Sequence, residues 1–284
     1  MSQKVLITGA SGFVGGFLVE EALNRGLEVY AAIRKTSNTQ YLTDPRIKFV
    51  HLDFENTDTL ANQLLENQYD YFIHNAGVTK TPLKDVYFKV NAEYLNNIIL
   101  AIQKSGLSLR KLTFISSLAA YGPAEYTDSG IVTESGKPHP VTNYGRSKLK
   151  AEGYLKAQEN IPYVIIRPTA VYGPREKDLF TVYQLLNRGL DLSVGLADQQ
   201  LTFIYVKDLV RVILDSTLAH KKNVAYFATD LAVHTSTSYT KAIKKALGNK
   251  AALKIKLPIT VVKLLGFVSE KIGGMFGNYP ALNV

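Results

Sequence analysis

Short apolar runs alternate with longer segments of helical periodicity along the first two thirds of this chain. The runs have the length of buried strands, and the segments between them repeat their apolar residues every three or four positions, as helices do. Such an alternation winds right-handed into a doubly wound parallel sheet, which binds ligands at the carboxyl ends of its strands. We therefore predict an α/β fold. The expected strands are 5–8, 28–33, 47–51, 71–74, 112–116 and 163–167, and the expected helices are 13–24, 57–66, 86–104 and 144–158.

The alternation loosens after Gly173. A strand at 202–205 and a helix at 208–218 are expected to return to the sheet, and the remainder predicts a small, irregular second lobe. The apolar stretch 257–277 is interpreted as a docking helix of that lobe or, alternatively, as an amphipathic surface anchor. We assign residues 1–173 and 201–228 to the sheet domain, and residues 174–200 and 229–284 to a substrate-binding lobe.

Composition excludes several classes of protein. The 284 residues include no cysteine, so disulfides, thiolate metal sites and thiol nucleophiles are excluded, and we predict no metal site. No window holds the roughly 18 uninterrupted apolar residues of a membrane span, and the first strand begins too early to leave room for a secretory signal, so we expect a cytoplasmic protein. The net charge of +9 favours anionic ligands such as phosphorylated cofactors. Nucleic acid is disfavoured, because the lysines are not interleaved with an aromatic stacking platform.

A glycine-rich turn, "VLITGASGFVG", follows the first strand and opens the first helix. In this context Gly9 is expected to make the tight turn, Gly12 to let a pyrophosphate approach the main chain, and Gly15 to let the helix pack on the strand. The free N–H groups at the helix start would face the phosphates. The alternative is a turn that joins strand to helix without any ligand. The other residues expected at the cofactor here are Ser11, Phe13 and Val14.

The order of several motifs resembles one family. "TGASGFVG", "YGRSK" and "RPTAVYGP", together with "HLDFEN", "HNAG", "VNAEYLNNII", "FISSLAAYG" and "FIYVKDLV", resemble the extended short-chain dehydrogenase/reductases, the NAD(P)-dependent epimerase/dehydratase group. The resemblance covers most of the chain and implies a Rossmann domain, a small-molecule substrate and a homodimer. Members of the family commonly continue beyond the segment that matches 278–284, so it also implies that a C-terminal segment is missing here.

A tyrosine and a lysine are the strongest candidates for chemistry. Tyr144 and Lys148 are four residues apart, so a helix would place them on one face, and "VTN" just before them offers an N-cap. A neighbouring ammonium group favours the phenolate and is expected to lower the pKa of Tyr144. The alternative is a surface helix that happens to carry both residues.

The resemblance implies a role for each of these residues. Tyr144 would act as general acid or base, Lys148 would bind the nicotinamide ribose, and Ser117 would hydrogen-bond the reacting oxygen. Ser116 would support the turn or touch the cofactor. Asn91 would hold a water in a proton relay, or alternatively would only bond backbone groups.

The residues after the second strand bear on the choice of cofactor. No acidic residue occurs at Ile33, Arg34 or Lys35, so a 2′-phosphate is favoured and we predict a preference for NADP(H), with NAD(H) possible. This pattern resembles the dihydroflavonol-reductase-like branch; the alternative is an arginine that covers a solvated strand end. Asp53 would bond the adenine amine or, alternatively, cap a helix. The other cofactor residues that the resemblance implies are Phe54, Asn75, Ala76, Gly77, Pro168 and Val171.

The same residues can serve several reactions. Sugar 4,6-dehydratases of this family carry an acid pair directly after the catalytic hydroxyl, whereas Leu118 and Ala119 follow Ser117, so elimination of water is disfavoured. We predict hydride transfer between nicotinamide and a carbonyl or secondary alcohol of a small metabolite. The alternatives are a nucleotide-sugar epimerase, whose pyrophosphate could lie on the lysines at 241–256, and a redox sensor that only binds NADP(H).

Overall fold

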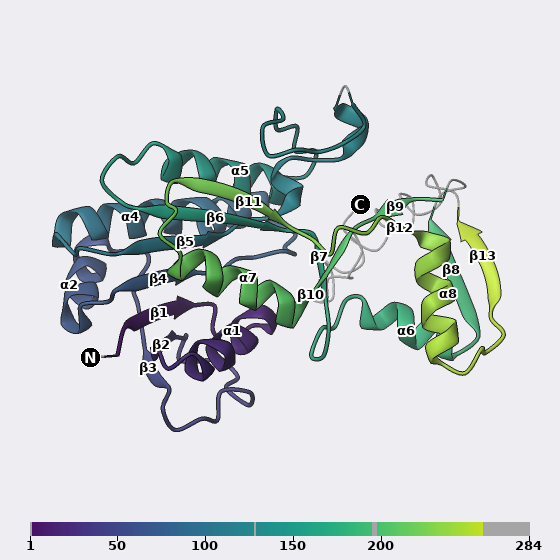
Figure 1. The fold of residues 1–284 in the computed structure, drawn as a ribbon, viewed down its shortest axis with the longest axis horizontal. Helices are drawn as coiled ribbons and strands as arrows, with labels where there is room; N and C mark the ends of the chain where they lie inside the picture. The colour runs from purple at the N-terminus through teal and green to yellow at the C-terminus, as the bar shows by residue number, and fades with distance from the viewer. Residues whose placement is uncertain (1, 128, 195–197, 258–284) are drawn as a thin grey trace. The chain divides into compact units, whose positions relative to one another are not determined.

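The computed structural model describes residues 2–127, 129–194 and 198–257. The chain divides into two compact units, of which the first comprises Met1–Val171 with Ile204–Thr229 and the second comprises Tyr172–Phe203 with Asp230–Val284. The candidate catalytic residues all belong to the first unit. Figure 1 shows the order of the elements along the chain.

A seven-stranded parallel sheet forms the centre of the first unit, so the predicted doubly wound α/β fold is confirmed. The order of its strands is β11-β6-β5-β4-β1-β2-β3. The order in which the strands are added reverses between β1 and β4, so the connections after these two strands lie on opposite faces of the sheet and leave a crevice at their carboxyl ends, which is where such sheets bind ligands. The strands are β1 (Lys4–Thr8), β2 (Glu28–Ala32), β3 (Lys48–Val50), β4 (Tyr71–His74), β5 (Lys111–Ile115), β6 (Tyr163–Pro168) and β11 (Val224–Ala228).

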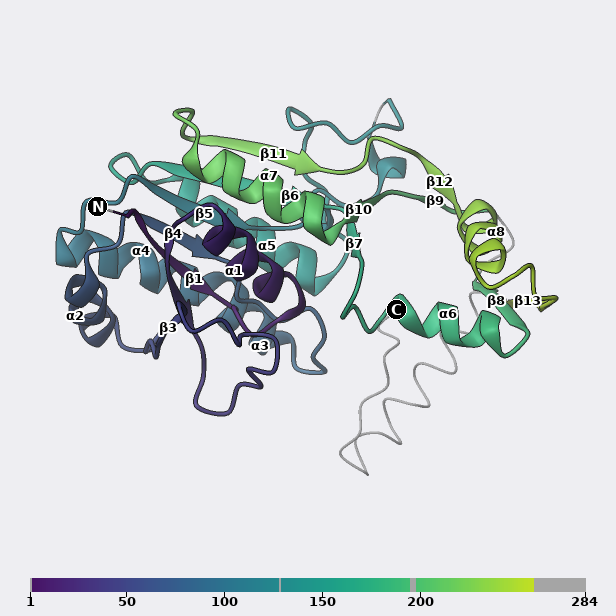
Figure 2. The same cartoon turned by 60° about the horizontal axis from the view of Figure 1, so that its bottom comes forward.

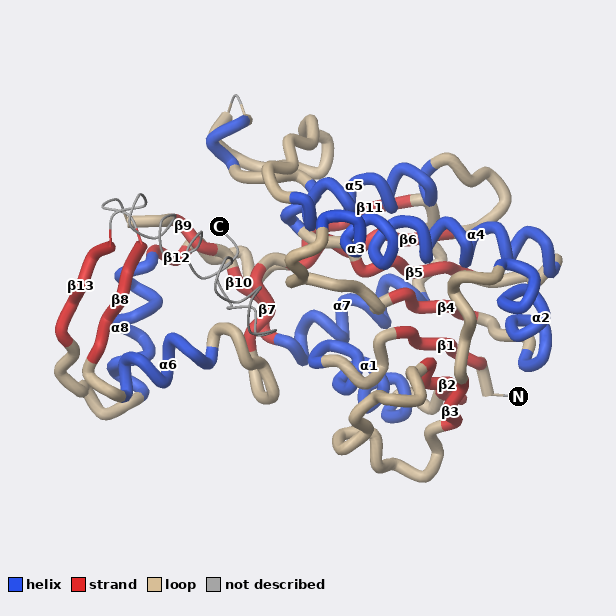
Figure 3. The backbone as a smooth tube through the Cα atoms, turned by 180° about the vertical axis from the view of Figure 1, so that it is seen from behind, coloured by secondary structure: helices blue, strands red, loops and turns tan. Residues whose placement is uncertain are grey.

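Helices cover both faces of this sheet (Figures 2 and 3). On one face lie α1 (Phe13–Asn24) and α7 (Val206–Leu218), and on the other lie α2 (Thr57–Asn67), α4 (Tyr94–Ser105) and α5 (Asn143–Lys156). Side chains alternate between the two cores along β1, where Val5 belongs to the first core and Leu6 to the second. Strands buried on both faces explain why the sequence shows continuous apolar runs there.

The strand predicted at 202–205 does not join the sheet. β10 (Phe203–Tyr205) pairs with β7 (Ala170–Tyr172), and the edge next to β6 is taken by β11, which the sequence analysis did not predict. The helix predicted after this strand does pack on the sheet, because α7 contacts β5 and β6. A parallel neighbour of β6 needs a crossover connection, and α7 supplies it for β11.

The helix predicted at 86–104 is also divided. The structure has α3 (Lys84–Phe88), a π-helical turn (Lys89–Glu93) and then α4. A π turn inserts one residue into the helical repeat, so the residues before and after it face different directions. Asn91 is fully buried in this turn.

The second unit is more regular than predicted. β8 (Leu190–Val194) pairs in parallel with β13 (Leu253–Leu257), and β9 (Gln200–Leu201) pairs with β12 (His234–Thr235). Its helices are α6 (Phe180–Asn187) and α8 (Ser236–Ala246). Nearly all of the apolar stretch at 257–277, and the C-terminal segment at 278–284, lie outside the described residues. Among the described helices none has both the length and the apolar character needed to cross a bilayer.

A buried lysine fastens the end of α7 to the sheet. Lys111, at the start of β5, is 3% exposed, and its Nζ donates to the carbonyl oxygens of Ser216 at 2.9 Å, Ala219 at 2.5 Å and Lys221 at 2.8 Å. Burial lowers its pKa. Ser216 and Ala219 lie at the end of α7, where carbonyl groups lack intrahelical partners, and Lys221 follows the helix.

We predict that Lys111→Met lowers the free energy of unfolding by about 1 to 3 kcal/mol, because three carbonyl groups lose a charged donor. Urea denaturation measures this loss. Lys104→Met is the control, since Lys104 pairs with Asp58 at the surface and its loss should change stability by less than about 0.5 kcal/mol. Equal effects of the two substitutions would contradict the prediction.

Candidate active site

The glycine turn is held by the carbonyl oxygen of Gly9. Gly9 has φ +66°, and a Cβ there would lie 2.8 Å from the backbone nitrogen of Ala76. A Cβ at Gly15 would lie 2.0 Å from the Gly9 oxygen, which also accepts the N–H of Gly12 at 3.0 Å. Packing alone therefore requires glycine at positions 9 and 15.

Gly12 differs from these two glycines. Its Cβ would meet only the Gly9 oxygen, at 3.2 Å, and the residue is exposed. Gly12 is also the N-cap of α1, where no side chain caps the helix and no acidic residue occupies the first turn. The first N–H groups of α1 thus lack side-chain acceptors, and this arrangement fits a phosphate group. Ser11, Phe13 and Val14 lie in the same turn, half-buried.

The end of β4 packs directly against this turn. Asn75 donates from Nδ2 to the Gly9 oxygen at 3.3 Å, and the Ala76 N–H donates to Thr8 Oγ1 at 3.2 Å. A Cβ at Gly77 would lie 3.2 Å from Nζ of Lys148. The "HNAG" segment therefore connects the glycine turn to the candidate catalytic lysine.

His74 is a residue of this region to which the sequence analysis gave no role. It is 1% exposed, its Nδ1 lies 2.9 Å from Thr8 Oγ1, and its ring stacks on Phe114. Burial, together with the charge of Lys148, lowers the pKa of His74 to about 3, so the ring is neutral at physiological pH. Its Nε2 has no hydrogen-bond partner among the described residues. In the sequence, the only signal for a role of His74 is its position at the end of an apolar run.

Helix α5 begins where "VTN" predicts a cap. Thr142 is the N-cap and its Oγ1 accepts the N–H of Gly145 at 3.0 Å. Lys148 is 3% exposed, and its Nζ donates to the carbonyl oxygen of Ile115 at 2.8 Å and lies 4.8 Å from the centre of the Phe114 ring. Burial lowers the pKa of Lys148 to about 8, against the opposing charge of Glu152.

Ser117 and Tyr144 meet at the end of β5. Ser117 caps the 3-10 turn Leu118–Ala120 through the N–H of Ala119 at 3.1 Å, and its side chain lies within reach of the Tyr144 hydroxyl. Burial raises the pKa of Tyr144, the interaction with Ser117 lowers it, and Tyr87, whose ring centre lies 6.4 Å away, raises it. The expected lowering by Lys148 is not found: burial raises the pKa of the phenol, and Lys148 is not among the groups that shift it.

Two other predicted residues make contacts inside the protein. Ser116 neither supports the turn nor faces an open site, because it is 3% exposed and donates from Oγ to Glu152 at 2.7 Å. Asn91 accepts the N–H of Val78 at 2.8 Å and donates to the Val78 oxygen at 2.9 Å and to Ser147 Oγ at 3.0 Å. The backbone-bonding alternative describes Asn91 here, and a relay role stays a prediction.

The residues expected near the adenosine lie at the ends of β2, β3 and β6. Arg34 is exposed beyond β2, and its N–H donates to Ser37 Oγ at 3.0 Å. Asp53 accepts the N–H groups of the two residues at 55–56, at 2.9 and 3.2 Å, but Asn56 is the cap of α2. The remaining placements are Phe54 stacked on Tyr94, Pro168 at the end of β6 and Val171 within β7.

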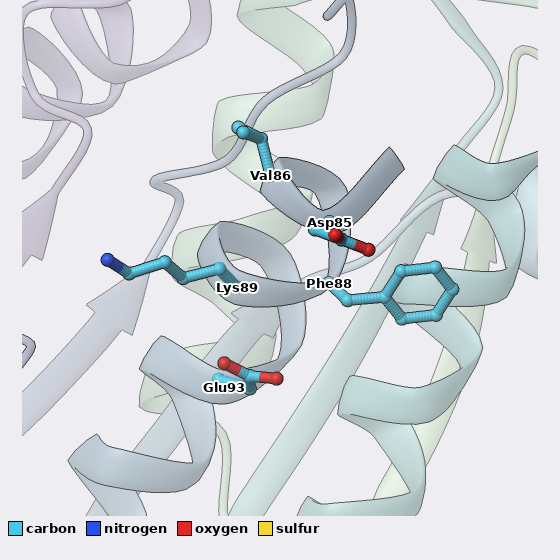
Figure 4. A pocket seen from close by; sticks show the side chains of 5 residues that line it. All are labelled: Asp85, Val86, Phe88, Lys89 and Glu93. Carbon is cyan, nitrogen blue, oxygen red and sulfur yellow. The ribbon is translucent and has the colours of Figure 1, made fainter. Parts of the chain in front are cut away.

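A separate surface hollow lies on α3 and the π-helical turn. It is lined by Asp85, Val86, Phe88, Lys89 and Glu93. In Figure 4 the side chains of Phe88 and Lys89 extend to opposite sides. The candidate catalytic residues do not line this hollow, so it is not part of the site described above.

Comparison with known proteins shows to which family the chain belongs. The model of the NAD dependent epimerase/dehydratase family matches residues 5–226. The chain belongs to this family. It is 30% identical to N-acetyl-alpha-D-glucosaminyl-diphospho-ditrans,octacis-undecaprenol 4-epimerase of Escherichia coli O157:H7, over 75% of this chain and 62% of that protein.

Other proteins similar to this chain are named for different activities. A ceramide reductase of Caulobacter vibrioides is 26% identical over 72% of this chain and 57% of its own length. The crystal structure of UDP-glucuronic acid 4-epimerase from Bacillus cereus in complex with NAD is 26% identical, with a TM-score of 0.77 over 90% of this chain and 88% of that chain. The chain thus spans less than two thirds of the length of the E. coli epimerase and of the reductase.

Gly145 was not among the predicted site residues, yet it lets the turn that follows Ser117 pack closely against the helix that carries Tyr144. A Cβ at Gly145 would lie 2.2 Å from the carbonyl oxygen of Ala119 and 3.0 Å from its carbonyl carbon. Only glycine lets the 3-10 turn approach α5 this closely. The motif "YGRSK" contains this glycine between Tyr144 and Lys148, and the roles expected of the tyrosine and the lysine alone do not include it.

We predict that Gly145→Ala destabilises the protein by about 1 to 3 kcal/mol, because the turn must move away from α5. Gly153→Ala, in the same helix with nothing within 4 Å of its Cβ, should instead stabilise by up to about 1 kcal/mol. Urea denaturation compares the two variants. The interpretation fails if both glycines accept alanine equally well.

Proposed function

We propose that this chain is a nucleotide-sugar 4-epimerase that uses a tightly bound nicotinamide dinucleotide. The observation that supports the proposal is that Ser117 and Tyr144 lie together on the same sheet edge as Lys148 and the uncapped start of α1. A pair that binds a substrate hydroxyl beside a nicotinamide would have this arrangement. The sugar substrate is proposed from the names of the E. coli and B. cereus relatives.

Epimerisation requires removal and return of a hydrogen at one carbon. A bound nicotinamide supplies the acceptor and then the donor of the hydride. Tyr144 takes the hydroxyl proton as the alcohol becomes a carbonyl, and it gives the proton back when the hydride returns to the opposite face. Ser117 bonds the same oxygen throughout, and Lys148 holds the nicotinamide ribose, so proton and hydride both balance over the cycle.

Dehydration is not supported by these side chains. The 3-10 turn after Ser117 consists of Leu118, Ala119 and Ala120, none of which can act as an acid. A sugar dehydratase needs a general acid to expel hydroxide. The remaining chemistry is hydride transfer alone, with or without its return.

A second candidate is a carbonyl reductase that prefers NADPH. The observation in its favour is Arg34, an exposed guanidinium at the end of β2 with Ser37 beside it and no acidic residue at 33–35. A 2′-phosphate would match these donors, whereas NAD was bound in the B. cereus epimerase. The ceramide reductase relative shows that the family also has reductases.

We predict that the purified protein interconverts UDP-linked sugars that differ at C4, and that Tyr144→Phe lowers kcat by about 10²-fold or more while nicotinamide binding stays near normal. A panel of UDP-glucose, UDP-N-acetylglucosamine and UDP-glucuronic acid, followed by NMR, measures this. Tyr154→Phe is the matched control, because Tyr154 lies on the same helix but outside the site.

Two results would count against this proposal. Net oxidation of NADPH with a ketone or aldehyde, without interconversion of any sugar, would favour the reductase. Tight dinucleotide binding without turnover of any of the UDP-sugars, ketones or aldehydes would favour a redox sensor.

For the cofactor we predict that Arg34→Asp weakens NADPH binding about tenfold to a hundredfold, through the loss of a charged hydrogen bond, and leaves NADH binding nearly unchanged. Titration calorimetry measures both. Arg46→Met is the control, since Arg46 is also exposed but pairs with Asp44. If the unmodified protein binds NADH more tightly than NADPH, Arg34 does not select the phosphate.

A further inference from the structure

A carboxylate that the proposed mechanism does not use is buried two turns beyond Tyr144. Glu152 lies on α5 with 0% exposure. Its two oxygens accept from Nε of Arg167 at 2.8 Å and from Nη2 at 2.7 Å, and Oε1 also accepts from Ser116 Oγ at 2.7 Å. Lys156 reaches Oε2 from the surface at 3.1 Å. One carboxylate therefore joins α5 to the ends of β5 and β6.

Arg167 extends this network to the loop at 121–140. Its guanidinium lies 4.3 Å from the centre of the Tyr121 ring and 5.4 Å from that of Phe227. The Tyr121 hydroxyl donates to the backbone oxygen of Glu134 at 3.1 Å, and the Glu134 carboxylate accepts the N–H of Phe227 at 3.1 Å. The loop that follows the 3-10 turn is thus tied to the same ion pair.

Stability does not account for such a pair. Removing two charges from water is expensive, and a buried ion pair is often no more stabilising than apolar side chains of the same volume. Its position is the informative feature. Ser116 precedes the candidate catalytic Ser117, and Glu152 follows Lys148 by one helical turn, so the carboxylate links the strand end before Ser117 to the helix that carries Lys148.

We propose that Glu152 is a positioning residue of the active site, which holds α5 against the end of β5 and places a negative charge one helical turn from Lys148. The roles of Ser117, Tyr144 and Lys148 in this statement rest on the proposed function. The geometric and electrostatic parts concern the protein alone.

The groups around Lys148 support the electrostatic part. From β4 it faces His74, which is neutral, and from β5 it faces the carbonyl oxygen of Ile115. On α5 itself, Glu152 is the charge that raises the pKa of Lys148, against burial that lowers the value to about 8. Removal of the Glu152 charge should leave burial unopposed and lower that pKa further.

The test measures Lys148 directly, by NMR titration of protein labelled with carbon-13 at the lysine ε position. Lys148→Met identifies the Lys148 signal by its disappearance. Glu152→Gln should lower the titration midpoint of Lys148 by about one pH unit. Lys156→Met removes the surface partner of the same carboxylate, and should leave the midpoint within about 0.3 unit.

Ser116→Ala separates position from charge. It removes the bond between the end of β5 and Glu152 but keeps the carboxylate, so the Lys148 midpoint should stay within about 0.3 unit while kcat falls about tenfold or more at saturating cofactor. If Glu152→Gln does not fold because Arg167 is left unpaired, the double variant Glu152→Gln with Arg167→Gln removes both charges and should still lower the midpoint.

An unchanged Lys148 midpoint in the folded glutamine variant, or in the double variant, overturns the electrostatic role. An unchanged kcat in Ser116→Ala overturns the positioning role. The titration needs neither substrate nor cofactor, so a shifted midpoint in a protein without epimerase activity would reject the proposed function and not the role of Glu152.

Discussion

The carbonyl oxygen of Gly9 is the point at which three elements of the sheet domain meet. It accepts the N–H of Gly12 at the start of α1 and the side-chain amide of Asn75 after β4, and it would lie 2.0 Å from any Cβ at position 15. Strand, helix and neighbouring strand are therefore held at backbone contact distance. This contact leaves the first N–H groups of α1 open beside the crevice between β1 and β4, where the order of the strands reverses. Such a crevice, with a helix start beside it, is where anions are best accommodated.

A layer of buried rings continues from this contact to the candidate catalytic lysine. Thr8 bonds His74, the neutral ring of His74 stacks on Phe114, and Nζ of Lys148 lies 4.8 Å from the centre of the Phe114 ring. The same burial that rigidifies this layer lowers the pKa of Lys148 to about 8 and raises that of Tyr144. Glu152, one helical turn further along α5, carries a negative charge that opposes the lowering of the Lys148 pKa.

Local sequence patterns predicted the candidate catalytic residues on α5 but not the buried residues that hold α5 against the sheet. The four-residue spacing of Tyr144 and Lys148, the cap at Thr142 and the bounds of α1 at 13–24 follow from short-range rules of helix geometry, and the structure has them. The partners of Glu152 come from positions 36 residues before it and 15 after it. Nothing in the local pattern of either segment specifies that meeting, because pairing across a sheet depends on the order of its strands.

The sequence by itself determined the alternation of strands and helices, the open glycine turn and the tyrosine–lysine pair, since each depends on residues a few positions apart. Tertiary structure decided the rest. It placed β11 instead of β10 at the sheet edge, inserted a π turn at Asn91, turned Ser116 inward to Glu152, and raised the pKa of Tyr144 where proximity to Lys148 predicted a fall. Each of these outcomes depends on burial and long-range packing, because desolvation and strand order are properties of the folded chain.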